Sequence, residues 1–188
     1  MPLTTNPKPS TPALGVCYYP EQWDEGRWPA DLQRMKSLGI RYVRVAEFAW
    51  SRFEPEPERF EFSWLQRFLD LAKKEGLAVV VGTPTATPPK WLVDSMPDMI
   101  ALDQDGLPRA FGSRRHYCFS HQGYRDKCRQ IVTQLAQAVG AHPAVYGWVL
   151  VQIVSSVYFY LARRFCNSKR TGQRPKCPER CLLFRLVV

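Results

Sequence analysis

Hydrophobic and polar positions follow patterns that predict parallel strands joined by amphipathic helices. Short runs rich in apolar and β-branched residues predict four strands, at about residues 15–19, 42–46, 77–81 and 145–150. The third run is apolar at every position, which is typical of a strand buried on both faces. Apolar residues spaced three and four apart predict helices at about residues 28–38, 64–75 and 124–139, with Ser63 as the expected N-cap of the second.

This order of elements indicates a parallel sheet with right-handed crossovers. Two architectures use that unit, the doubly wound sheet and the (β/α)8 barrel. No glycine-rich phosphate turn follows the first strand, where residues 19–23 read Tyr-Pro-Glu-Gln-Trp. Aromatic residues and carboxylates instead follow the predicted strands, a combination suited to sugar rings, and barrels place their chemistry at these strand ends. We therefore expect an α/β fold, a (β/α)8 TIM barrel.

Length limits how much of that barrel is present. A complete barrel takes about 250 residues, whereas the fourth strand begins near residue 145 of a chain of 188 residues. We expect residues 13–150 to form the N-terminal half of the barrel, its first four strands. Residues 1–12 are rich in proline and threonine, and we expect them to be disordered.

Two glutamates and one loop offer candidate chemistry. Glu47 directly follows the second strand, where barrels often place functional carboxylates, but it can equally hold a neighbouring loop through hydrogen bonds; Glu21 is a weaker candidate of the same kind. The segment 112–118 combines Arg114 with His116 and Cys118. Arginine can clamp a hydroxyl group or simply tie the loop to the barrel rim, and histidine titrates near neutrality. A single cysteine is a weak zinc signal, since zinc needs about four ligands.

Four long motifs in this order resemble the N-terminal catalytic barrel of the glycoside hydrolase family 42 β-galactosidases. They lie at residues 15–23, 44–51, 82–92 and 112–125. The resemblance implies a retaining hydrolase that removes terminal non-reducing β-D-galactose from β-galactosides. It also implies that Arg114 contacts galactose, and that Cys118 corresponds to a zinc ligand of some members. The family requires no cofactor, and the other zinc ligands of those members, a short cysteine-rich segment, have no counterpart here.

The resemblance is lost within the fourth strand. The family places an Asn-Glu pair there, whose glutamate is the acid/base; here Gln152 and Ile153 stand at those positions, and Ile153 cannot donate a proton. The nucleophile follows strand seven, which the 188 residues do not reach. We therefore predict no catalytic carboxylate in this chain and little or no activity. The alternative is a fragment that binds galactosides without cleaving them.

Charge is divided unevenly between the two parts of the chain. Of the overall +9, residues 1–150 have 18 Lys+Arg against 16 Asp+Glu, and residues 151–188 have 8 against 1. Such a basic tail can bind nucleic acid or anionic lipid. Its unpatterned sequence begins inside a strand, however, which is typical of a frameshifted or truncated gene, so we do not expect nucleic acid as a partner.

The remaining expectations concern location and partners. The chain has no apolar run of 18 residues, so we expect no membrane span. Its first residues have no apolar core, so we expect no secretory signal and a cytoplasmic protein. A β-galactoside is the expected partner, and intact relatives are expected to form homo-oligomers.

Overall fold

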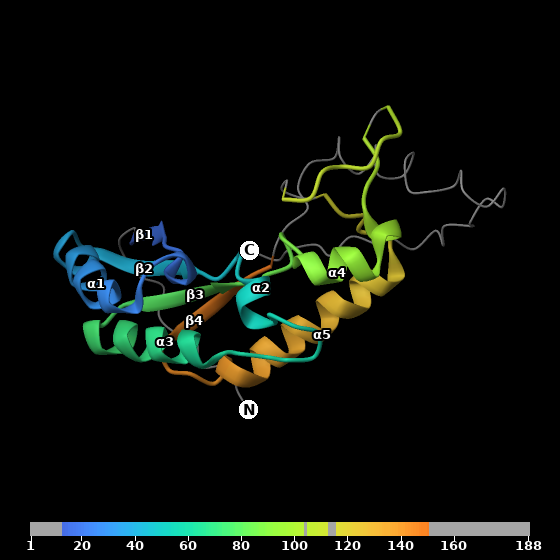
Figure 1. Ribbon diagram of the computed structural model, residues 1–188. Helices are drawn as coiled ribbons and strands as arrows, with labels where there is room; N and C mark the ends of the chain where they lie inside the picture. Colours follow the sequence, from blue (N-terminus) through green and yellow to red (C-terminus); the bar gives the residue numbers. More distant parts are fainter. Residues whose placement is uncertain (1–12, 104, 113–115, 151–188) are drawn as a thin grey trace.

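Four parallel strands form the centre of the computed structural model, which describes residues 13–103, 105–112 and 116–150 (Figure 1). The strands are β1 (Leu14–Cys17), β2 (Ile40–Val45), β3 (Ala78–Gly82) and β4 (Val145–Val149), and they lie in the order β1-β2-β3-β4. Each strand pairs in parallel with the next along the chain, which is the arrangement of successive barrel strands. The expected segment 1–12 and tail 151–188 lie outside the described residues.

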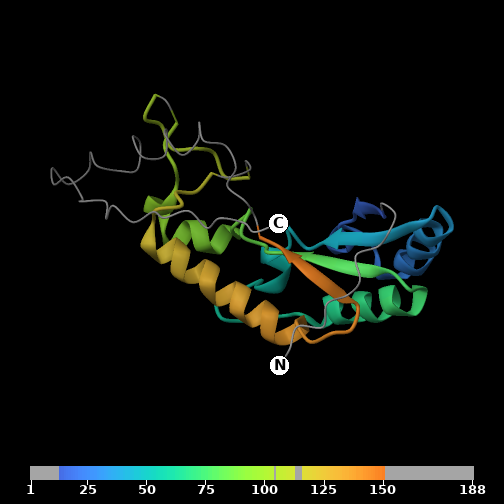
Figure 2. The ribbon, with the colours of Figure 1, turned by 180° about the vertical axis from the view of Figure 1, so that it is seen from behind.

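Three longer helices connect the strands: α1 (Trp28–Ser37), α3 (Ser63–Glu75) and α5 (Gln122–Val139). Figures 1 and 2 show α3 and α5 on the same side of the sheet, and α1 packs against α3 and β2. Their apolar faces meet the sheet in one core. Its fully buried side chains include Leu32, Val43, Val45, Leu65, Phe68, Leu69, Val79, Val81, Ile131 and Leu135.

Shorter elements lie around the carboxyl ends of the strands. Helices α2 (Trp50–Phe53) and α4 (Lys90–Ser95) follow β2 and β3, and three single-turn 3-10 helices occupy Pro20–Gln22, Glu25–Arg27 and Pro97–Met99. None of these was predicted from periodicity, because an element of six residues or fewer is too short to show a helical repeat. No helix within the described ranges is both long and apolar enough to cross a membrane.

The structure corrects two details of the predicted pattern. Ser63 is the first residue of α3 rather than its N-cap, which is Phe62 and makes no side-chain capping bond. Strand β3 is fully buried on one face only: Val79 and Val81 are 0% exposed, whereas Ala78 and Val80 are half-buried. An apolar sequence alone does not distinguish a covered face from an open one.

Candidate functional site

The carboxyl ends of β1 and β2 bring aromatic and charged side chains together. The ring of Tyr19, which follows β1, lies 5.3 Å from the ring of Phe48, which follows β2. Burial raises the pKa of Tyr19, and the nearby Cys17 and Glu47 raise it further. Because parallel strands end at the same edge, residues 29 positions apart in sequence become neighbours. This aromatic pair beside a carboxylate is the chemistry expected for a sugar-binding rim.

Glu47 is buried at this edge and forms an ion pair with the half-buried Arg44. It is 4% exposed, and its Oε2 lies 2.5 Å from Nη2 of Arg44 on the preceding strand. The intervening Ala46 has a φ of 71°, a left-handed conformation that costs a non-glycine residue about 1–2 kcal/mol. That turn redirects the chain after β2, so Glu47 can reach back to Arg44. The arrangement supports the role of Glu47 in holding its surroundings.

Glu21 lies in a different environment from Glu47. Both of its carboxylate oxygens are buried without a hydrogen-bond partner among the described residues. This burial raises the pKa of Glu21 to about 7, despite the opposing charge of Arg52. Nη1 of Arg52 donates to the main-chain oxygen of Glu21 at 2.7 Å, which ties the turn after β1 to α2. Glu21 is therefore a protonatable group close to the strand ends.

The loop before α5 is anchored by main-chain bonds and aromatic packing. His116 is 1% exposed, and its ring makes edge contacts with Phe111 and Tyr117 at 5.5 and 5.8 Å. Cys118 is 6% exposed, and its amide donates to the carbonyl oxygen of Met99 at 2.6 Å. Arg114, the predicted galactose contact, and Ile153, at the predicted acid/base position, lie outside the described residues.

Cys118 belongs to no cluster of metal-ligating side chains in the described part of the chain. A structural zinc needs about four ligands, and a catalytic zinc needs three from the protein. No group of three or more His, Cys, Asp or Glu side chains suited to a metal occurs within residues 13–103, 105–112 and 116–150.

Sequence reasoning missed a buried acceptor beneath the rim. Glu54 is 1% exposed, and its carboxylate accepts bonds from Nε1 of Trp50 at 2.9 Å and from the amide of Glu58 at 3.1 Å. Its main-chain oxygen also accepts from Nε1 of Trp91 at 3.0 Å. Glu54 thus joins α2 to Trp91 of α4. The two prolines that follow it, at 55 and 57, mark a rigid turn in the sequence, but they do not reveal that Glu54 is buried.

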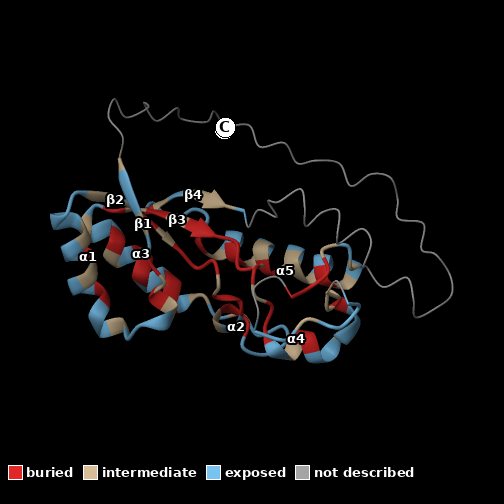
Figure 3. Ribbon diagram, turned by 90° about the horizontal axis from the view of Figure 1, so that it is seen from above, coloured by how far each residue is buried: buried red, intermediate tan, exposed pale blue. Residues whose placement is uncertain are grey.

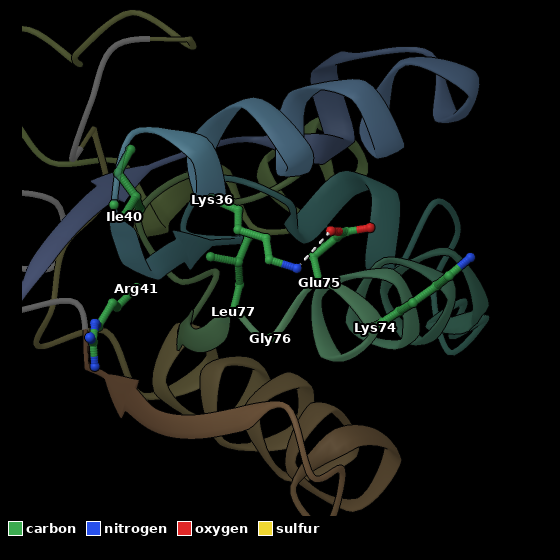
Figure 4. Close-up of a pocket in the computed structure, with 8 residues that line it drawn as sticks. Lys36, Ile40, Arg41, Lys74, Glu75, Gly76 and Leu77 are labelled. Carbon is green, nitrogen blue, oxygen red and sulfur yellow. Dashed lines mark hydrogen bonds and ion pairs between the residues drawn. The ribbon is translucent and has the colours of Figure 1, made fainter.

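The opposite end of the sheet carries a hollow of about 420 Å³. The hollow lies where α1 leads into β2 and α3 leads into β3. Nζ of Lys36 forms an ion pair there with Oε2 of Glu75, at 3.4 Å (Figure 4). Arg41 and Lys74 point away from each other there. Cations at helix carboxyl ends balance the exposed carbonyl groups. This end of a barrel usually serves stability rather than catalysis, and the hollow fits that role. Its lining comprises Lys36, Gly39, Ile40, Arg41, Lys74, Glu75, Gly76 and Leu77.

Strand order and helix placement define the class: the described residues form the first four strands of a (β/α)8 barrel and the three helices that connect them. The family whose description is β-galactosidase, glycoside hydrolase family 42, matches residues 17–160. The chain belongs to this family.

Similar proteins agree in both sequence and structure. The chain is 56% identical over 135 residues to β-galactosidase BgaA of a Thermus species and 53% identical to a β-galactosidase of Thermus thermophilus, in each case over 72% of this chain and 21% of the relative. It matches the crystal structure of a β-galactosidase from the psychrophilic Marinomonas ef1 with a TM-score of 0.71 and 54% identity, over 73% of this chain and 21% of that one. The chain therefore spans about a fifth of the length of these relatives.

Proposed function

We propose that this chain descends from an enzyme that hydrolyses terminal non-reducing β-D-galactose residues from β-galactosides with retention of configuration. The observation that carries the proposal is the family match over residues 17–160, together with 56% identity to a β-galactosidase. Retaining hydrolysis uses two carboxyl groups about 5–5.5 Å apart, one as acid/base and one as nucleophile.

Within that scheme the described residues bind and position substrate rather than react with it. The carboxylate of Glu47 is engaged by Arg44 and is not placed to attack a sugar. Tyr19 and Phe48 supply an aromatic surface, and we propose that Arg114 supplies the hydrogen bonds to galactose. The acid/base position is occupied by Ile153, which carries no proton, so we propose that the 188-residue polypeptide has no turnover by itself.

An assay of the purified polypeptide on an aryl β-galactoside tests this proposal. We expect release of the aryl alcohol to stay at the level of a buffer blank, while a full-length family member assayed in parallel releases it readily. Turnover by the polypeptide comparable to that of the full-length relative would contradict the proposed inactivity.

Galactoside binding without cleavage is the second candidate function. The observation that favours it is the Tyr19–Phe48 ring pair, which lies beside the buried Glu47. Titration calorimetry with galactose, on the unaltered chain and on Arg114→Ala, tests it. We expect heat of binding from the unaltered chain and at least a strong reduction in the variant. An absence of heat from both proteins would exclude this function.

A further inference from the structure

The carboxyl group of Glu21 is enclosed without a partner for either oxygen. Both oxygens are buried and accept no hydrogen bond from the described residues, although the residue as a whole is only half-buried. Burial of this kind favours the protonated form of a carboxyl group. Once the proton is lost, a buried carboxylate needs a cation or hydrogen-bond donors to offset its charge. Ionised Glu21 therefore needs a partner that protonated Glu21 does not have.

Arg52 on α2 supplies a cation next to Glu21. Its Nη1 donates to the main-chain oxygen of Glu21 at 2.7 Å, and its guanidinium lies over the ring of Trp64, 4.8 Å from the ring centroid. Figure 3 shows the buried positions of α2 in red, and the side chain of Arg52, between them in sequence, is 35% exposed. Because the guanidinium already contacts the main chain of Glu21, we expect a change of side-chain torsions to bring it to the carboxylate.

The ion pair that Arg52 forms at present is weak and can be given up. Nη2 of Arg52 lies 3.6 Å from Oε1 of Glu25, which is beyond the usual length of a hydrogen bond. Glu25 meanwhile accepts two bonds from Arg67, at 2.6 and 2.8 Å, and these bonds lower the pKa of Glu25. Such bidentate contacts are strong. Glu25 thus keeps a cation when Arg52 moves away.

The other titratable and charged groups around this turn are engaged elsewhere. They are Cys17 and Tyr19 at the end of β1, Asp24 before the second 3-10 helix, the Tyr18–Asp31–Arg27 group at α1, and the Arg44–Glu47 pair of β2. Of the charged groups, Arg52 is the one that opposes the effect of burial on the pKa of Glu21. Arg52 is therefore the partner available to ionised Glu21.

The turn that carries Glu21 is held more firmly than Arg52. Nε1 of Trp28 donates to the carbonyl oxygen of Pro20 at 3.2 Å, and the amide of Gln22 donates to that of Tyr19 at 3.0 Å. Arg52 is held by one main-chain bond, one long ion pair and a ring contact. Movement of the arginine is therefore the easier response to a new charge on Glu21.

We propose that Arg52 is a proton-controlled switch: when Glu21 loses its proton to solvent, the guanidinium of Arg52 leaves Glu25 and forms an ion pair with the Glu21 carboxylate. The ionised carboxylate supplies the difference in interaction energy that separates the two positions. The contact joins the two segments that carry the aromatic pair of the rim. Tyr19 precedes Glu21 by two residues, and Phe48 precedes Arg52 by four. The proposal does not depend on galactoside hydrolysis or binding.

Nuclear magnetic resonance of the isotope-labelled chain between about pH 5 and pH 9 tests this inference. The carboxyl carbon of Glu21 and the Nε group of Arg52 should titrate with one shared midpoint, near pH 7. Nuclear Overhauser contacts between the side chain of Arg52 and the methylene protons of Glu25 should be present at the low pH and lost at the high pH. In Glu21→Gln, the Arg52 signal should not titrate.

Two further variants separate the switch from general effects of charge. Glu25→Gln removes the carboxylate that holds Arg52 away from Glu21, so the midpoint should fall by about one pH unit. Glu75→Gln is the matched control, because Glu75 also forms an ion pair, with Lys36, but lies at the opposite end of the sheet. It should leave the midpoint unchanged.

Three kinds of result would overturn the inference. If Glu21 titrates while Arg52 keeps its contacts with Glu25, the carboxylate has found another partner or has moved into solvent. If the Arg52 signal titrates equally in Glu21→Gln, or if the Glu25 and Glu75 variants shift the midpoint alike, Arg52 does not respond to Glu21. A Glu21 that is already ionised at pH 5 would also exclude the switch. If Glu21→Gln does not fold, the contacts of Arg52 in the unaltered chain at the two pH values decide.

Discussion

Gly82, the last residue of β3, lies against the main chain of Glu47. A Cβ atom added at Gly82 would stand 3.1 Å from Cα of Glu47 and 3.2 Å from its amide nitrogen. Those atoms follow the left-handed Ala46 and belong to a residue that is ion-paired and buried. The absence of a side chain at residue 82 is therefore part of what sets the position of Glu47 at the rim.

Gly82→Ala should consequently destabilise the fold. Main-chain atoms cannot move aside as a flexible side chain can, and overpacking of this kind costs about 1–3 kcal/mol. Urea unfolding followed by tryptophan fluorescence measures the change. Gly147→Ala on β4 is the matched control, because its added Cβ meets nothing within 4 Å; it should be neutral or slightly stabilising. Equal effects of the two variants would contradict the close-approach argument.

The buried carboxyl of Glu21 should make stability depend on pH. Burial raises its pKa from 4.5 to about 7, so the folded chain retains a proton that the unfolded chain releases at lower pH. The stability this proton contributes is fully present below pH 4.5 and is lost as the pH rises through 7. A shift of this size corresponds to roughly 3 kcal/mol across that window.

Glu21→Gln isolates this effect from the other titrating groups. Glutamine cannot ionise and keeps the main-chain oxygen that Arg52 contacts, so the variant should match the unaltered chain at pH 5 and exceed it in stability at pH 8. Unfolding curves of both proteins at the two pH values give the difference directly. A difference that is the same at pH 5 and pH 8 would show that Glu21 has an ordinary pKa.

The sequence predicted the parallel strand-helix units well, because Val43, Val45 and the apolar positions of α3 repeat with the periods of strand and helix. It located Glu47 and Glu21 at the strand ends without separating their roles. That difference comes from main-chain geometry and from tertiary burial. Arg44 pairs with Glu47 through the turn at Ala46, whereas the carboxylate oxygens of Glu21 are buried without a hydrogen-bond partner among the described residues. Neither the conformation of a non-glycine residue nor the burial of a glutamate has a sequence pattern.

Glu54 should prove more important for folding than its sequence context indicates. Glu54→Ala would leave the indole N–H of Trp50 and the amide of Glu58 without their acceptor, and unsatisfied donors of charge-assisted bonds cost about 2–3 kcal/mol. Glu61→Ala is the control: Glu61 is a surface residue whose ion pair with Arg59 lies in solvent, and such pairs contribute about 0–1 kcal/mol. Urea unfolding of both variants measures the contrast. Similar small losses in both variants would show that water replaces the carboxylate at no cost and that the rim does not depend on these bonds.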